Sequence, residues 1–336
     1  DLYSLARCLL VLVLNLPTYQ TAHRHELPSA DQEPLFRQHE SFHRFLLKAT
    51  AQDPEDRYQT ADEMADALEA VLRQVASVNQ GAARPAPSKV FGGDVSALRG
   101  AATDASPGPD WRLLPPLRVD PRDPAASYVL DALALEPGQQ VRMLRDGMAQ
   151  GLIEVTTEAE LGLARALVEA GLHAEAEVSL SRIEAAGVRE WRGSWYRGLS
   201  LLAQGRPAEA GRCFDLVYSE LPGELAPRLG LALAAELAGH LDLAATHYHV
   251  VASADPGFVS ASFGLARVRL AQGHVAGAVE AYRRVPPTSS LHSQAQLALA
   301  RALIRGGRPV PTVDDLALAS SVIERLSLPA EQRAGL

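Results

Sequence analysis

Glycine recurs every 34 residues in the second half of the chain. Five glycines share this spacing, at Gly171, Gly205, Gly239, Gly273 and Gly307. Each of the first four is followed after five residues by an alanine, at Ala176, Ala210, Ala244 and Ala278. Each alanine is followed after four more by a bulky residue, at Leu180, Phe214, Tyr248 and Tyr282. Three independent positions with one period restrict this half of the chain to a stack of similar units.

Each unit is predicted to be two helices joined by a tight turn. Glycine ends the first helix because a left-handed backbone costs it little. The alanine lets the two helices approach closely, and the bulky residue lies on the same face one turn later and fills the space between units. Pro222 and Pro256 then end two of the second helices. This period and pattern resemble the tetratricopeptide repeat.

The two ends of the array depart from the pattern. Around Gly307, Thr312 stands where alanine is expected, which is typical of a terminal capping unit. Residues 125–148 are predicted to supply helices that pack against the other end. The repeat domain is therefore assigned to residues 125–336.

The first helices of such arrays line the face that binds peptides or other domains. Trp195, Leu229 and Phe263 occupy equivalent positions there, and Arg192 and Arg267 lie close by. One interpretation is an apolar groove with arginines at its margin. The other is that these residues form the core between helices, and the sequence leaves both open.

Residues 77–124 are rich in proline, glycine, alanine and serine. That composition favours an extended, surface-lying linker. It separates the repeats from a first block, residues 1–76.

The first block resembles the end of the C-lobe of a protein kinase. A helix ends at the sequence AQDPEDR, and the next begins at TADEM with Thr60 as the expected N-cap and Glu63 at the capping-box position. Asp53, Pro54 and Arg57 stand where kinases carry a DPxxR turn. The resemblance implies that Arg57 pairs with a glutamate of the activation segment. It also implies that Asp1, which leads the apolar stretch DLYSLARCLL, holds the catalytic loop.

The order of these parts is similar to that of the mycobacterial-type serine/threonine protein kinase G family. The resemblance covers essentially the whole chain and includes the stretches ELPGELAPRLGLALAAELAG and VPPTSS. It implies an all-α chain: partial kinase C-lobe helices joined by a proline-rich linker to a tetratricopeptide α-solenoid. It also implies that the intact protein transfers the γ-phosphate of ATP, with magnesium, to protein hydroxyls. The repeats would recognise a protein substrate or regulator, such as a phosphopeptide-binding regulator of central metabolism, or support homodimerisation in the cytoplasm.

The catalytic motifs of a kinase do not occur in this sequence. Phosphoryl transfer needs a glycine-rich loop, a strand lysine, an HRD-type aspartate and a DFG aspartate. Only Lys48 and Lys89 are present, and neither lies on a predicted strand. We therefore expect a C-terminal fragment of a kinase, without ATP, magnesium or another cofactor bound to this part. The alternative is a non-catalytic repeat scaffold with a degenerate kinase lobe.

A remote alternative is a zinc hydrolase, because HESFH, residues 39–43, fits the HExxH signature. His39 and His43 would be the ligands, with Glu63 as a possible third. The motif fixes few positions in a chain with 10 histidines, and the kinase resemblance explains the same helix without metal.

The net charge of −8 argues against a nucleic-acid partner. Only two cysteines, Cys8 and Cys213, are present, which favours a reducing cytoplasm over a disulfide framework. No apolar stretch is long enough to predict a membrane span.

Overall fold

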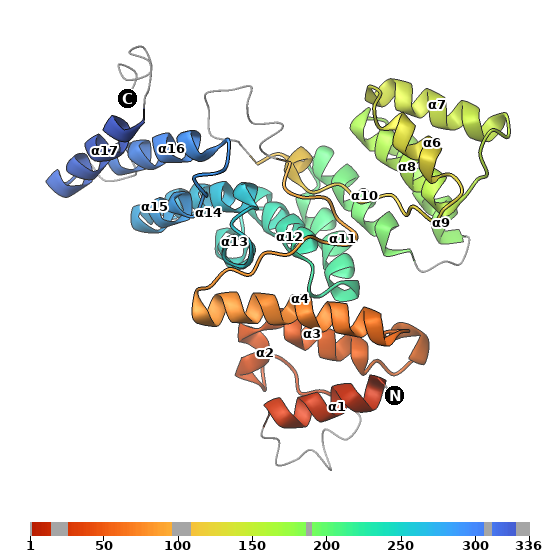
Figure 1. The fold of residues 1–336 in the computed structure, drawn as a ribbon, viewed down its shortest axis with the longest axis horizontal. Coiled ribbons are helices and arrows are strands. Elements are labelled where there is room, and N and C mark those ends of the chain that lie inside the picture. Colours follow the sequence, from red (N-terminus) through yellow and green to blue (C-terminus); the bar gives the residue numbers. More distant parts are fainter. Residues whose placement is uncertain (1, 15–25, 96–108, 186–189, 306–310, 327–336) are drawn as a thin grey trace. The chain divides into compact units, whose positions relative to one another are not determined.

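The computed structural model describes residues 2–14, 26–95, 109–185, 190–305 and 311–326. Two compact units divide the chain. The first contains Asp1–Pro85, Tyr218–Leu225 and Ser253–Asp255, and the second contains Ala86–Val217, Ala226–Ala252 and Pro256–Leu336. Within the described ranges the regular structure is helical, apart from one isolated antiparallel bridge between Phe91 and Leu117 (Figure 1). The predicted all-α class is confirmed.

Four α-helices and a 3₁₀ turn build the first unit. They are α1 (Leu2–Val13), α2 (Pro34–Gln38), α3 (Glu40–Ala49), η1 (Pro54–Asp56) and α4 (Ala61–Gln80). Their shared core consists of apolar side chains: Ala6, Leu10, Leu14, Phe36, Phe42, Phe45, Leu46, Ala49, Tyr58, Met64 and Val71. Helix α1 buries one side only, and Leu5, Val11 and Leu12 remain exposed.

The turn between α3 and α4 is held by side chains that cap backbone groups. Asp53 accepts a hydrogen bond from the backbone N–H of Glu55 at 3.0 Å, and Pro54 opens η1. Thr60 is the N-cap of α4 and accepts from the N–H of Glu63 at 3.1 Å. The carboxylate of Glu63 accepts from the N–H of Gln59 at 2.9 Å. The carboxylate thus satisfies a donor one residue before the cap.

Arg57 closes the same turn through the backbone. Its guanidinium donates to the carbonyls of Ala51 and Gln52 at 2.7 and 3.0 Å, and it lies over the ring of Tyr3 at 4.7 Å. These contacts compensate its charge within the first unit. Asp1 lies outside the described residues.

The first unit also includes a loop that is distant in sequence. Lys48 forms an ion pair with Glu220 at 3.1 Å, and the amide of Gln74 donates to the carbonyl of Gly223 at 2.8 Å. A Cβ atom at Gly223 would lie 2.3 Å from the Cβ of Ala70 in α4, so only glycine permits this approach.

The second unit repeats the pair of helices predicted from the 34-residue period. The first helices of the pairs begin at intervals of 34 residues: α8 (Thr157–Glu169), α10 (Trp191–Ala203), α12 (Leu225–Leu237) and α14 (Val259–Ala271). The second helices are α9 (His173–Ala185), α11 (Pro207–Glu220), α13 (Leu241–Ala254) and α15 (Val275–Arg283). Each first helix is followed by a left-handed glycine with a φ of 71° to 81°: Gly171, Gly205, Gly239 and Gly273. All four repeat alanines, Ala176, Ala210, Ala244 and Ala278, are fully buried.

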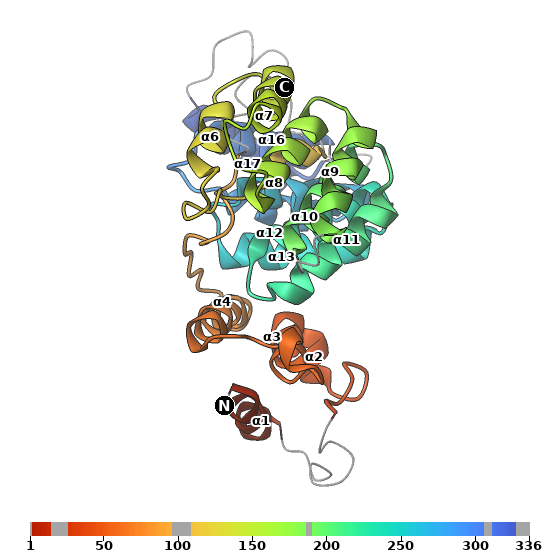
Figure 2. The same cartoon turned by 90° about the vertical axis from the view of Figure 1, so that its right-hand side faces the viewer.

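Further helices flank these four pairs. Helices α6 (Ala126–Ala132) and α7 (Pro137–Ala149) lie beside α8 (Figure 1, Figure 2). At the other end, α16 (His292–Arg305) packs against α17 (Val313–Arg325). Thr312 is not an alanine-like packing residue, because it forms a capping box with Asp315 that begins α17. Gly307 lies outside the described residues.

Parts of the proline- and glycine-rich stretch carry buried side chains. Phe91, Leu114 and Leu117 are buried, and a short 3₁₀ turn, η2 (Trp111–Leu113), lies among them. All of these residues belong to the second unit. The boundaries predicted at residues 76 and 124 therefore do not coincide with where side-chain packing begins and ends.

No helix within the described ranges is long and apolar enough to cross a lipid bilayer.

Candidate peptide-recognition face

The equivalent residues Trp195, Leu229 and Phe263 lie in the interior of the repeats. Their exposed fractions are 0, 2 and 0%. The ring centroid of Trp195 is 5.2 Å from that of Phe214, and that of Phe263 is 5.5 Å from that of Tyr282. The structure therefore places these three residues in the core between helices, and they do not line an open groove.

Glycines in the first helices make room for the bulky repeat residues. A Cβ atom at Gly198 or Gly230 would lie 2.6 or 2.8 Å from the ring of Phe214. At Gly264 it would lie 2.4 Å from Cζ of Tyr248. These glycines escaped the sequence analysis because they do not share the 34-residue spacing of the turn glycines. Gly230 and Gly264 are nevertheless 34 residues apart, and that signal could have found them.

Arg192 forms a buried ion-pair cluster at the start of α10. It donates to Glu158 of the preceding repeat at 2.6 Å and to both oxygens of Glu190 at 2.7 Å. Burial raises the pKa of Glu158, although Arg192 acts in the opposite direction. Arg192 thus ties two repeats together.

Arg267 makes the corresponding connection between α12 and α14. Its guanidinium grips Glu236 in a bidentate pair at 2.8 Å, and the hydroxyl of Tyr248 donates to the same carboxylate at 2.7 Å. Burial, together with the charge of Glu236, raises the pKa of Tyr248 well above its ordinary value. Both predicted margin arginines are therefore engaged in carboxylate pairs.

Phe91 covers the start of α10. Its ring centroid is 4.9 Å from that of Trp195, in an edge-on arrangement, and 5.8 Å from that of Trp191. Only 1% of Phe91 is exposed. An aromatic side chain from the predicted linker is thus inserted between two tryptophans of the repeat array.

Asp94 binds the start of α14. One carboxylate oxygen accepts from the backbone N–H of Ser260 at 2.8 Å and from its hydroxyl at 2.5 Å. The N-cap residue of this helix, Phe258, makes no capping bond with its side chain. Asp94 therefore supplies from another segment the negative group that a helix N-terminus favours.

The segment between these two anchors pairs with another part of the same stretch. The N–H of Gly92 donates to the carbonyl of Pro116 at 2.8 Å, and the N–H of Arg118 donates to that of Val90 at 2.9 Å. The side chain of Arg118 adds a bond to the carbonyl of Phe91 at 2.8 Å. Residues 88–94 thus lie as a short extended strand, and we call them the covering segment.

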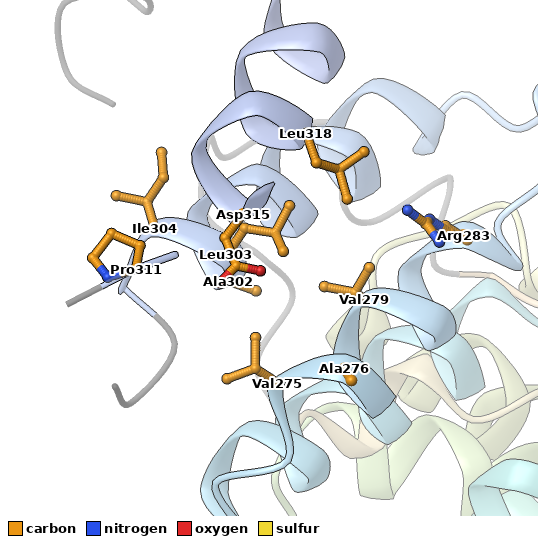
Figure 3. Close-up of a pocket in the computed structure, with 10 residues that line it drawn as sticks. All are labelled: Val275, Ala276, Val279, Arg283, Ala302, Leu303, Ile304, Pro311, Asp315 and Leu318. Carbon is orange, nitrogen blue, oxygen red and sulfur yellow. The ribbon is translucent and has the colours of Figure 1, made fainter. Parts of the chain in front are cut away.

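A separate hollow of about 250 Å³ lies among α15, α16 and α17 (Figure 3). Its wall is mainly apolar and includes Val275, Val279, Leu303 and Leu318. The carboxylate of Asp315 at its edge is already bonded to Thr312. This hollow offers apolar contact but no group placed for acid–base chemistry.

The HESFH histidines are held by ordinary packing. His43 stacks on Phe36 with ring centroids 4.3 Å apart, and His39 is the N-cap of α3. Burial lowers the pKa of both. Glu63, the possible third ligand, is bonded to Lys48 and Gln59. No group of three potential metal ligands occurs in the described part of the chain.

We therefore expect the purified chain to contain no stoichiometric zinc. Elemental analysis by mass spectrometry, after dialysis against zinc and then against metal-free buffer, measures it directly. One zinc per chain, lost when His39→Ala and His43→Ala are introduced together, would contradict this expectation.

Known proteins show similarity over both halves of the chain. The family model described as protein kinase G tetratricopeptide repeat matches residues 112–335. The serine/threonine-protein kinase PknG of Mycolicibacterium smegmatis is 34% identical over 327 residues, which cover 91% of this chain and 43% of that protein. The PknG of Mycobacterium leprae is 36% identical over 330 residues, covering 91% and 42%. The chain thus spans about two fifths of the length of these relatives. A solved mutant of MamA aligns with a TM-score of 0.38 at 18% identity, covering 47% of this chain and 91% of that one.

Proposed function

Because this chain belongs to the protein kinase G tetratricopeptide repeat family, we propose that it is the protein-recognition region of a serine/threonine protein kinase. The observation that carries the proposal is the face formed by α10 and α14, which holds an extended segment through an aromatic and a carboxylate anchor. Extended segments anchored by a few side chains are a common form of protein recognition.

In this proposal the chemistry belongs to the catalytic part of the kinase. ATP and magnesium are bound there, and the γ-phosphate passes to serine or threonine hydroxyls of proteins. The repeats select the protein substrate or a regulator, including a phosphopeptide-binding regulator of metabolism, in the cytoplasm. They are also a candidate surface for homodimer formation.

The test transplants residues 112–335 into the Mycolicibacterium smegmatis relative in place of its matching segment. This hybrid is compared with a form that ends before the repeats. We expect phosphorylation of a generic serine peptide to differ by less than about twofold, because the peptide is too short to need the repeats. Labelling of proteins in a kinase-inactivated extract should fall about tenfold without the repeats, which corresponds to ~1.4 kcal/mol of lost binding.

Equal losses with peptide and protein would contradict the proposal, because they would indicate a damaged catalytic part. Unchanged labelling of proteins would contradict it as well. The unaltered 336-residue chain serves as the negative control, and it should transfer no γ-phosphate by itself.

A further inference from the structure

The covering segment is held on the repeats mainly by its two anchors, Phe91 and Asp94. The intervening Gly92 bonds to Pro116 of its own stretch, and Gly93 is exposed. Upstream, residues 81–87 are all exposed. The segment therefore presents to α10 and α14 what an external peptide would present: one aromatic ring and, three residues later, one carboxylate.

The aromatic anchor leaves a polar group of its site unsatisfied. The Nε1–H of Trp195 is buried and has no hydrogen-bond acceptor among the described residues. A buried donor without an acceptor destabilises the arrangement that encloses it. The covered state is therefore a less than complete fit, and a segment that offers an acceptor to Trp195 would bind more favourably.

The carboxylate anchor is specific in its chemistry. Ser260 offers a backbone N–H and a hydroxyl to the same oxygen at the start of α14. Two converging donors at a helix N-terminus favour a negative group over a neutral one. The site thus selects an acidic residue at a fixed distance from an aromatic one.

We propose that residues 88–94 are an internal ligand of a peptide-binding site formed by Trp191, Trp195 and Ser260. In their place the site binds an extended segment of a protein partner with an aromatic residue followed three residues later by an aspartate or glutamate. The inference rests on the proposed function of the repeats in protein recognition. The internal ligand competes at a high effective concentration, so the partner binds weakly until the segment is released.

The probe is a fluorescein-labelled peptide with the sequence of residues 88–95, SKVFGGDV. Its binding is measured by fluorescence anisotropy to the unaltered chain and to a variant carrying both Phe91→Ala and Asp94→Ala. We expect the variant to bind at least about tenfold more tightly, because its site is no longer occupied. Arg84→Ala, in the exposed stretch just before the segment, is the matched control and should bind like the unaltered chain.

Two further changes test the anchors. Ser260→Asp, added to the opened variant, should abolish binding through repulsion of the peptide carboxylate, while an aspartate near a helix N-terminus is compatible with folding. A peptide with alanine in place of its phenylalanine should not bind the opened variant. Equal affinity of the opened variant and the unaltered chain, or binding that ignores Ser260→Asp, overturns the proposal.

A disulfide lock covers the case in which the opened variant does not fold. Asp94→Cys and Ser260→Cys are introduced together with Cys8→Ser and Cys213→Ser, which remove the two free cysteines. The reduced protein should bind the peptide and the oxidised protein should not. Equal binding in both states overturns the proposal.

These outcomes are separable from those of the kinase hybrid. If the hybrid selects proteins but the opened chain does not bind the peptide, the internal ligand is wrong and the proposed function stands. If the peptide binds but the hybrid shows no selection, the site exists and the proposed function is wrong.

Discussion

Replacing Arg267 by methionine should lower the free energy of unfolding of the second unit by about 3 kcal/mol. The change leaves the carboxylate of Glu236 and the hydroxyl of Tyr248 without the charge that compensates them. The side chains of Arg267 and Glu236 are only 20 and 11% exposed, so water cannot replace the lost partner well. Methionine keeps most of the apolar stem, so the loss reports on the charge more than on packing. Urea unfolding followed by circular dichroism measures the effect.

The matched control is Arg206→Met. Arg206 pairs with Glu209 through a bond of 2.6 Å, but the two side chains are 49 and 43% exposed. Exposed pairs contribute little, so the expected loss is below about 0.5 kcal/mol. Similar losses for Arg206→Met and Arg267→Met would contradict the assignment of Arg267 as a buried link between repeats.

Gly264→Ala should also destabilise the second unit, again by about 3 kcal/mol, because overpacking a closed core has costs of this order. The new Cβ would lie 2.4 Å from Cζ and 2.5 Å from Cε1 of Tyr248. The ring of Tyr248 cannot move aside easily, because it is buried and its hydroxyl is bonded to Glu236. Thermal and urea unfolding of the purified chain both measure this loss.

Gly211→Ala is the control for the same chemical change. Gly211 lies inside helix α11, and the nearest listed neighbour of a Cβ there would be Ala234 at an ordinary 3.8 Å. Alanine is the better helix former, so we expect stability to stay equal or to rise by up to about 1 kcal/mol. Tyr248→Leu in the Gly264→Ala background should recover part of the loss, since the two sites are in contact. Additive losses in the double variant would argue against the steric explanation.

The helical array could be predicted from the sequence because its signal is local and repeated. Turn glycines such as Gly205 need a left-handed backbone, and small residues such as Ala210 must fit where two helices cross. Both requirements act within one repeat, so they appear as fixed spacings. Equivalent positions also identified one face of the first helices through Trp195 and Phe263.

What lies against that face could not be predicted in the same way. Phe91 and Asp94 belong to a stretch without helical or alternating periodicity, and their partners are more than 90 residues away. Composition describes the average character of such a stretch. An isolated aromatic residue within it is the one local sign that a side chain is buried. Thr312 shows the same limit, because its role depends on Asp315 and not on its place in the repeat.

The loop Tyr218–Leu225 has a consequence for how such a protein can be inherited. It belongs to the first unit, where Glu220 pairs with Lys48 and Gly223 accepts from Gln74. A genetic crossover between relatives anywhere in residues 86–217 would join helices α3 and α4 of one parent to the loop of another. Gly223, which admits no side chain against Ala70, would then face a helix that evolved beside a different loop. Recombination within the repeats is therefore selected against, and the kinase-derived helices and this loop should descend as one block.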